Sequence, residues 1–246
     1  MTRTMPTTGF IHSIETAAAV DGPGMRFMLF MQGCMLRCWY CHNPDTWAMR
    51  QGREYTVQDV LDEVKPYKSF LKRAGGVTIS GGEPLVQSEF VGEVLKELKA
   101  LGLHTALDTQ GYLHSKISDE WLQNVDLVLL DIKHIRPEKY HDLTGVNLQP
   151  TLDFAQRLSR LGKKMWIRYV LVPGVTDDPE DIRELGRFVA TLEGVEQVEV
   201  LPFHKLGEHK WQALDLPYRL TDTPAAPSVL VEQTIGLLKA SGLPVR

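Results

Sequence analysis

Short apolar segments of strand length alternate along the chain with longer segments whose apolar residues recur at helical spacing. Strand-length segments separated by helices are typical of parallel βαβ units. The apolar segments lie at residues 25–32, 77–80, 104–108, 126–131, 164–171 and 197–202. The pattern therefore predicts an α/β domain with about six parallel strands, arranged as an incomplete barrel or an open sheet.

The segments between the strands carry start and stop signals of helices. Thr56 precedes a periodic segment and has Asp59 three residues later, which predicts a capped helix through about residue 73. Pro66 lies inside this segment and is expected to bend or split the helix. Further helices are expected at residues 88–101 and 152–161, after Asp178-Pro179, and at residues 228–241.

The 246 residues, of which 43% are hydrophobic, suit one large domain. We expect a core at about 25–205, an N-terminal extension at 1–24 and a C-terminal helix at 226–246. The net charge is −4 and no basic run occurs, which argues against a nucleic-acid partner. The first ten residues lack the apolar segment of a signal peptide, and the apolar run 27–31 is too short to cross a bilayer. A cytoplasmic protein without membrane contact is expected.

All three cysteines lie in the stretch GCMLRCWYCHN, as Cys34, Cys38 and Cys41. In a reducing compartment, clustered thiols are usually metal ligands or catalytic groups. One alternative is a structural zinc site with His42 or a distant histidine as fourth ligand, although such sites more often use paired C-x2-C segments. Three thiolates would leave one iron of a [4Fe-4S] cluster without a protein ligand, which favours a cluster at which a substrate or cofactor binds.

Polar or glycine-rich residues stand at the predicted strand ends, where parallel α/β folds bind ligands. They are expected to meet at one edge of the sheet. They comprise residues 34–42 after the first strand, 81–84 after the second, 108–111 after the third, Asp131 and Lys133 after the fourth, Arg168 within the fifth, and His204 after the sixth.

The spacing C-x3-C-x2-C, with the aromatic residue Tyr40 before the third cysteine, resembles the signature of the radical S-adenosylmethionine enzymes. Within that superfamily the chain is similar to the activases of glycyl-radical enzymes. The resemblance implies a partial (β/α)6 barrel of parallel strands. It rests on IHSIETAAAVDGPGMRFMLFMQGCMLRCWYCHNPDTW, SGGEP, LDTQG, DLVLLDIKH, WIRYVLVPGVTDD and LPFHKLGEHKW, which extend from residue 11 to residue 211.

The resemblance implies reductive cleavage of S-adenosylmethionine at one [4Fe-4S] cluster and removal of a Cα hydrogen from a specific glycine of a partner enzyme. Three cysteines leave no room for the extra cluster-binding insert of several activases, which favours pyruvate formate-lyase as the partner. A low-potential electron donor such as flavodoxin or ferredoxin is expected. The alternatives are a radical enzyme acting on another glycyl-radical enzyme or a small molecule and, more remotely, a zinc-stabilised binding protein.

The resemblance also assigns residues. Cys34, Cys38 and Cys41 would ligate the cluster and act in catalysis through it. The resemblance places Asp108 and Asp131 near the methionine carboxylate, where the negative charges would repel unless a monovalent cation or Lys133 lay between them. His209 and Trp211 receive no role. The expected cofactor-binding residues are Tyr40, Cys41, His42, Gly82, Glu83, Asp108, Asp131, Lys133, Arg168 and His204.

Several of these assignments have a plainer alternative. Tyr40 and His42 would otherwise only pack within their loop, and the Gly81-Gly82 pair would only form a tight turn. The two aspartates would cap turns, and His204 would be structural. Residues 21–24, DGPG, form either a turn or a contact with the partner's loop.

Overall fold

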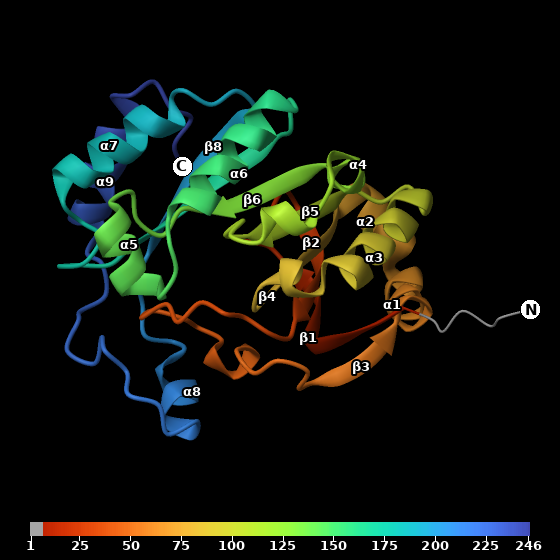
Figure 1. Ribbon diagram of the computed structural model, residues 1–246. Helices are drawn as coiled ribbons and strands as arrows, with labels where there is room; N and C mark the ends of the chain where they lie inside the picture. Colours follow the sequence, from red (N-terminus) through yellow and green to blue (C-terminus); the bar gives the residue numbers. More distant parts are fainter. Residues whose placement is uncertain (1–6) are drawn as a thin grey trace, which may run out of the picture. The chain divides into compact units, whose positions relative to one another are not determined.

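The computed structural model describes residues 7–246 (Figure 1). Its strands follow the order β3-β1-β2-β4-β5-β6-β7-β8 in one sheet. Because this order has two ends, the sheet is open, as expected for a partial barrel. Residues 1–6 of the expected N-terminal extension lie outside the described residues, as does most of the segment considered for a signal peptide.

The six predicted strands are all present, and the pairs β2–β4, β4–β5 and β7–β8 are parallel. The residues of β4 and β6 are almost all buried, as in parallel sheets covered on both faces. The strands are β2 (Met25–Met31), β4 (Gly75–Gly81), β5 (Thr105–Thr109), β6 (Leu127–Asp131), β7 (Met165–Leu171) and β8 (Val195–Pro202). The α/β prediction is confirmed.

Two strands were not predicted. β1 (Thr8–Ala18) pairs antiparallel with β2 and with β3 (Arg53–Thr56). The pairing of β1 with β2 shifts register between Ile11 and Ser13 and again between Glu15 and Ala18. Such irregularities interrupt the alternation of buried and exposed positions by which a strand is recognised in sequence.

Helix α1 (Val57–Val64) begins with the predicted capping box. Asp59 N donates to Thr56 Oγ1 at 3.1 Å, and Thr56 N donates to Asp59 Oδ2 at 2.8 Å. Pro66 lies in the 3-10 turn Lys65–Tyr67, which separates α1 from α2 (Lys68–Ala74). The predicted break at the proline is therefore confirmed.

The other predicted helices are also present: α3 (Ser88–Ala100), α6 (Gln149–Arg160), α7 (Pro179–Val189) and α9 (Ser228–Lys239). α6 begins before the predicted residue 152 because Pro150 fits its first turn. The short helices α4 (Asp119–Leu122), α5 (Pro137–Thr144) and α8 (Glu208–Ala213) were not predicted. A helix of one or two turns presents too few residues for a periodic pattern.

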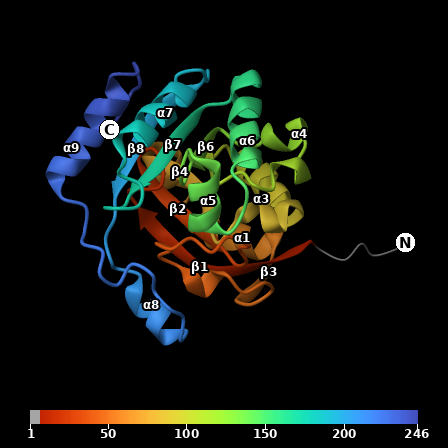
Figure 2. The same ribbon diagram turned by 60° about the vertical axis from the view of Figure 1, so that its left-hand side comes forward.

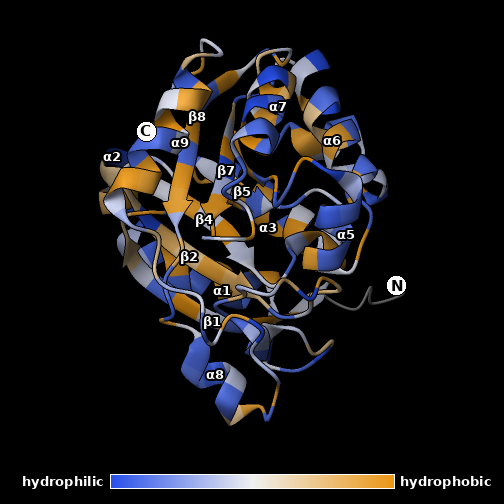
Figure 3. Ribbon diagram, turned by 90° about the vertical axis from the view of Figure 1, so that its left-hand side faces the viewer, coloured by the Kyte–Doolittle hydropathy of each residue, from blue (hydrophilic) through white to orange (hydrophobic). Residues whose placement is uncertain are grey.

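The chain divides into two compact units. Unit 1 comprises residues up to 35, 46–109 and 115–129, and unit 2 comprises residues 36–45, 110–114 and 130–246. In unit 1, α2 packs on β2 and β4, and α3 packs on β1 and β5; in unit 2, α7 packs on α9, and α9 on β8 (Figure 2). Figure 3 shows β2 and β4 as mainly hydrophobic and α8 as mainly hydrophilic. The domain boundaries expected from the sequence stay a prediction.

Residues 21–24 and the cysteine stretch lie at opposite ends of β2. The first precedes Met25 and the second follows Met31, and a strand of this length spans about 20 Å. Thr78 Oγ1 donates to Asp21 O at 2.8 Å and accepts from Arg26 Nε at 2.9 Å. Burial lowers the pKa of Arg26 to about 10. The DGPG turn therefore lies before the amino-terminal end of β2, where Asp21 is linked through Thr78 to the buried guanidinium of Arg26.

Replacing Gly24 with alanine should destabilise the metal-free protein. Gly24 has φ +73°, and an added Cβ would lie 1.9 Å from Ala74 O. The unfavourable backbone and the steric clash together predict a loss of about 2 kcal/mol or more in the free energy of unfolding. Urea denaturation measures it. The control is Gly236→Ala in α9, where nothing lies within 4 Å of the new Cβ; it should stabilise by about 0.5–1 kcal/mol. Equal stability of Gly24→Ala and wild type would contradict this turn geometry.

Candidate functional site

The stretch 33–43 that carries the cysteines forms neither helix nor strand. The side chains of Cys34 and Cys38 are 7% and 8% exposed, and Cys41 is half-buried; all three are thiols rather than disulfides. Cys34 belongs to unit 1, whereas Cys38 and Cys41 belong to unit 2. The predicted site residues therefore fall into two groups, one in each unit.

In unit 1 the glycine turn after β4 lies directly against the first cysteine. Glu83 N donates to Gly33 O at 2.8 Å, and Gly82 N donates to Met31 O at 2.8 Å. A Cβ on Gly82 would lie 2.4 Å from Gly33 O and 3.2 Å from the Cβ of Cys34. Only glycine allows the two segments to approach this closely, so Gly82 and Cys34 are brought together as predicted.

The carboxylate of Glu83 is used inside unit 1. It is 1% exposed and accepts hydrogen bonds from Thr109 Oγ1 at 2.7 Å and from Leu85 N at 2.9 Å. Its side chain therefore fixes the turn, and a ligand would meet this residue through its main chain. At the end of β5, Asp108 Oδ2 accepts a hydrogen bond from Ser80 Oγ at 2.7 Å.

In unit 2, Lys133 links an acidic residue to the cysteine stretch. Its Nζ lies 2.8 Å from Asp131 Oδ2 and 5.6 Å from the centre of the Tyr40 ring. Burial favours the neutral amine, but the ion pair with Asp131 outweighs it and holds the pKa of Lys133 well above its usual value. Burial raises the pKa of the Cys38 thiol to about 12, and the charge of Lys133 partly opposes this increase. Lys133 thus favours the thiolate that a metal requires.

The end of α5 supports the middle of the cysteine stretch. Arg37 N donates to Thr144 O at 2.7 Å, and Trp39 N donates to Leu143 O at 3.2 Å. Carbonyls in the last turn of a helix lack partners within the helix, so they are available to bind an irregular segment. Tyr40 packs into a buried apolar cluster with Leu143, Val172, Phe203 and Leu220.

His42 and His204 are also brought together. Their rings stack with centroids 4.4 Å apart, and His42 Nε2 lies 3.2 Å from His204 O. Burial lowers the pKa of His42, which favours its neutral form.

Arg168 on β7 lies opposite Glu199 on β8, with Arg168 Nε 3.5 Å from Glu199 Oε2. The sequence analysis had not predicted Glu199 as a partner of Arg168.

Sequence reasoning gave no role to the residues of α8 that hold the cysteine stretch. Trp211 Nε1 donates to Cys41 O at 2.8 Å, and Lys210 Nζ lies 2.8 Å from Asn43 Oδ1 and 3.0 Å from Asp45 Oδ2. The motif LPFHKLGEHKW was the available signal, but no pattern within it indicates a contact so distant in sequence. His209 is exposed, and its Nδ1 lies 2.9 Å from Leu206 O.

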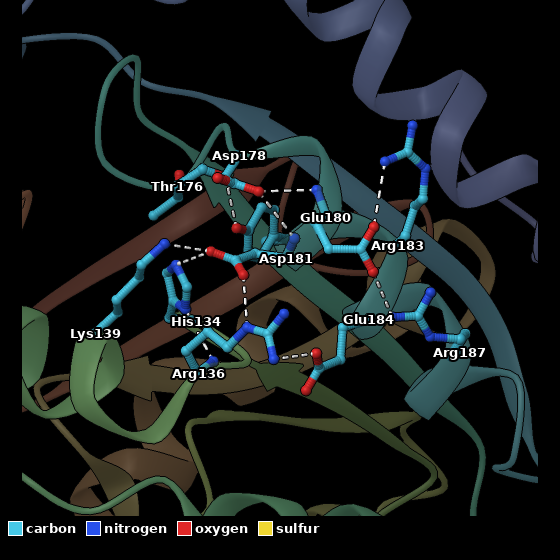
Figure 4. A network of polar contacts seen from close by, with 11 residues as sticks. His134, Arg136, Lys139, Thr176, Asp178, Glu180, Asp181, Arg183, Glu184 and Arg187 are labelled. Atoms are coloured by element: carbon cyan, nitrogen blue, oxygen red, sulfur yellow. Dashed lines mark hydrogen bonds and ion pairs between the residues drawn. The ribbon is translucent and has the colours of Figure 1, made fainter.

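An ion-pair network centred on Asp181 joins α7 to α5 (Figure 4). The Asp181 side chain is 5% exposed and lies 2.6 Å from Arg136 Nε, 2.5 Å from Lys139 Nζ and 3.5 Å from His134 Nε2. Burial would raise the pKa of Asp181, but the hydrogen bonds from Lys139 and Arg136 outweigh it, and the pKa is lowered. Arg136 also pairs with Glu184. The network therefore anchors the helix whose last carbonyls hold the cysteine stretch.

The three thiols fit an iron–sulfur cluster by their chemistry. Thiolates are the usual ligands of such clusters, and Gly82 places no side chain of its own beside Cys34. In unit 2 the buried hydroxyl of Tyr40 has no hydrogen-bond partner among the described residues, so it is available to a bound group. No set of three or more His, Cys, Asp or Glu side chains within residues 7–246 is positioned to bind a metal ion without rearrangement.

Comparison with known families matches residues 28–186 to the radical SAM superfamily, whose enzymes use S-adenosylmethionine and a [4Fe-4S] cluster. The match covers more than half of the chain and includes all three cysteines and the glycine turn. The chain therefore belongs to the radical SAM superfamily.

Its relatives narrow the similarity further. A pyruvate formate-lyase-activating enzyme from Staphylococcus epidermidis is 46% identical over 242 residues, which cover 95% of this chain and 96% of that protein. The enzyme of the same name from Staphylococcus aureus is 47% identical over 225 residues, or 88% of this chain and 90% of that protein.

Two solved structures support the fold. A domain of a pyruvate-formate lyase-activating enzyme from Bacteroides vulgatus has a TM-score of 0.59 at 27% identity and covers 70% of this chain and 98% of that chain. Streptococcus suis SuiB bound to the precursor peptide SuiA has a TM-score of 0.69 at 18% identity and covers 92% of this chain and 48% of that chain. Among residues 7–246, none of the helices has the length and apolar character needed to cross a membrane.

Acidification should destabilise the protein through His134. Arg136 N donates to His134 Nδ1 at 3.0 Å, and burial lowers the pKa of His134 from 6.5 to about 4. Between these pH values the unfolded chain takes up a proton that the folded chain does not. Stability should therefore fall with decreasing pH by at most about 1.4 kcal/mol per unit.

Urea denaturation from pH 7 to pH 4 tests this dependence. His134→Asn keeps an acceptor for Arg136 N and should make the free energy of unfolding depend less steeply on pH in this range. His209→Asn, at an exposed position, should leave the pH dependence unchanged. A curve for His134→Asn that is as steep as that of wild type would contradict the assignment.

Proposed function

We propose that this chain activates pyruvate formate-lyase by removing a hydrogen atom from the Cα of one specific glycine, which leaves a stored glycyl radical. The observation that carries the proposal is the 46% identity, over 95% of the chain, to a relative of that named activity. A glycine Cα suits this reaction because its radical is delocalised over the two flanking peptide groups. The substrate is a segment of protein, so the partner has to present its glycine outside its own fold.

Cys34, Cys38 and Cys41 are the proposed ligands of one [4Fe-4S] cluster. When bound, the cluster and S-adenosylmethionine supply the one-electron and radical chemistry, and the protein positions them and excludes competing reactions. Each thiol gives up its proton when it binds the metal. Lys133 assists this step at Cys38, whose thiol pKa is otherwise raised by burial.

The proposed residues for S-adenosylmethionine divide by chemistry. Gly82 and Glu83 offer main-chain groups beside the first cysteine, because the Glu83 carboxylate is already committed to Thr109 and Leu85. Lys133 and Arg168 offer positive charge for the carboxylate of S-adenosylmethionine. Asp108 and Asp131 offer negative charge for the proposed monovalent cation. The remaining residues are those of the cysteine stretch and the histidine that stacks on it: Tyr40, Cys41, His42 and His204.

One electron must reach the cluster in each cycle. A low-potential carrier such as flavodoxin or ferredoxin is the proposed donor of this electron. We also propose a cytoplasmic location, where a reducing environment keeps the three thiols available.

An electron paramagnetic resonance experiment tests the activity. Reduced, cluster-loaded protein mixed anaerobically with S-adenosylmethionine and pyruvate formate-lyase should produce a glycyl-radical doublet on the lyase. Replacing any of the three cysteines with alanine should abolish both the doublet and cleavage of S-adenosylmethionine. Cleavage by wild type without a doublet would favour a small-molecule substrate. Stoichiometric zinc with no cleavage would refute the radical assignment.

A monovalent cation near Asp108 and Asp131 is proposed to balance these carboxylates and that of S-adenosylmethionine. Replacing potassium with the bulky cation choline should then weaken binding of S-adenosylmethionine about tenfold, a modest charge effect. Equilibrium dialysis of cluster-loaded protein measures this. Asp108→Asn should reduce the dependence on potassium, whereas Asp119→Asn, on the surface turn of α4, should not. Equal affinity in both salts would exclude the cation.

A further inference from the structure

The segment 204–211, from His204 to Trp211, contacts the third cysteine and the residues after it at several points within unit 2. We infer that Trp211 is a positioning residue that fixes Cys41 as a cluster ligand through a hydrogen bond to its carbonyl. This inference rests on the proposed function, in which Cys41 binds the cluster.

Trp211 has a defined orientation. Its side chain is 5% exposed on α8, and Nε1 donates to Cys41 O at 2.8 Å. The indole packs on Tyr218 with ring centroids 5.2 Å apart and an angle of 54° between the planes. An indole nitrogen can only donate a hydrogen bond. The buried N–H of Trp211 is therefore satisfied only when the acceptor lies along the N–H direction. The bond therefore determines where the Cys41 carbonyl points.

The peptide groups on both sides of Cys41 are thereby held. Cys41 N donates to Cys38 O at 3.1 Å, and Cys41 O accepts from Trp211. With both groups fixed, the backbone of Cys41 has little freedom and its sulfur is limited to a few staggered positions about χ1. Without the indole donor, the peptide group between Cys41 and His42 can rotate and carry the sulfur and the imidazole with it.

Other contacts of the segment 204–211 hold residues 41–45. Lys210 Nζ lies 2.8 Å from Asn43 Oδ1 and 3.0 Å from Asp45 Oδ2. His204 stacks on His42. A Cβ on Gly207 would lie 2.7 Å from the Cα of His42, so glycine permits the close approach. Residues 41–45 are thus held by a segment more than 160 positions away in the sequence, and Trp211 is its contact with a proposed ligand.

The chain offers a matched control for the tryptophan bond. Trp121 Nε1 donates to Ser88 O, also at 2.8 Å, within unit 1. Trp211→Phe and Trp121→Phe both remove an indole donor and leave a carbonyl without it, while each keeps an aromatic ring. A role in general stability predicts similar effects of the two substitutions, whereas a role in positioning the ligand predicts different effects at the cluster.

The experiment uses reconstituted, cluster-loaded protein and a ferrous chelator. The rate of iron loss should rise about fivefold in Trp211→Phe, the effect of one hydrogen bond, and stay near the wild-type rate in Trp121→Phe. The spectrum of the reduced cluster, recorded by electron paramagnetic resonance, should shift only in Trp211→Phe. Equal rates and unshifted spectra in both variants would overturn the inference.

Two further measurements keep the result interpretable. Thermal unfolding of the metal-free variants shows whether they fold. Lys210→Met removes the contacts of Lys210 with Asn43 and Asp45. It should also speed iron loss, but by less than Trp211→Phe, and it provides a test if Trp211→Phe does not fold. Iron and sulfide analysis of wild type comes first: about four irons per chain support the proposed function, and their absence would overturn both that function and this inference.

Discussion

Residues 33–43 form neither helix nor strand, so several of their peptide groups hydrogen-bond to partners outside the cysteine stretch. Two short helices of unit 2 supply some of these partners. The last carbonyls of α5 accept from Arg37 and Trp39, and the indole of α8 donates to Cys41. Short helices with unsatisfied ends are well suited to this purpose. The elements around the stretch thus supply hydrogen bonds as much as apolar contacts.

Helix α5 is itself too short to be stable alone. Its Tyr140 and Leu143 are buried, and Lys139 at its start pairs with Asp181. Because Asp181 also binds Arg136 and lies beside His134, one carboxylate holds both the helix and the turn that precedes it. The Asp181 side chain is only 5% exposed, so removing one of these partners would leave a nearly buried carboxylate less well compensated. A substitution at Asp181 on α7 would therefore loosen α5 and, with it, the carbonyls that bind the cysteine stretch.

The sequence predicted those features that leave a local signal. The six predicted strands, the Thr56–Asp59 capping box and the break at Pro66 each depend on neighbouring residues. The proximity of Gly82 and Cys34 was expected because both residues follow the carboxyl ends of predicted parallel strands. By contrast, β1 has an irregular register, and the bond from Trp211 to Cys41 joins residues whose proximity is decided by the whole of unit 2. The Asp181 network was missed for the same reason, since its members come from two helices and a turn.

The position of the cysteine stretch after β2 has a consequence for local motion. β2 is hydrogen-bonded along both edges, to β1 and to β4, and is buried along most of its length. Its amide hydrogens should exchange with solvent only when the sheet opens as a whole. Residues 37–41 are held by a handful of separate bonds, so their amides should exchange by small local openings. The segment can then admit iron and sulfide after folding is complete, while β2, which precedes it in the chain, keeps its native structure.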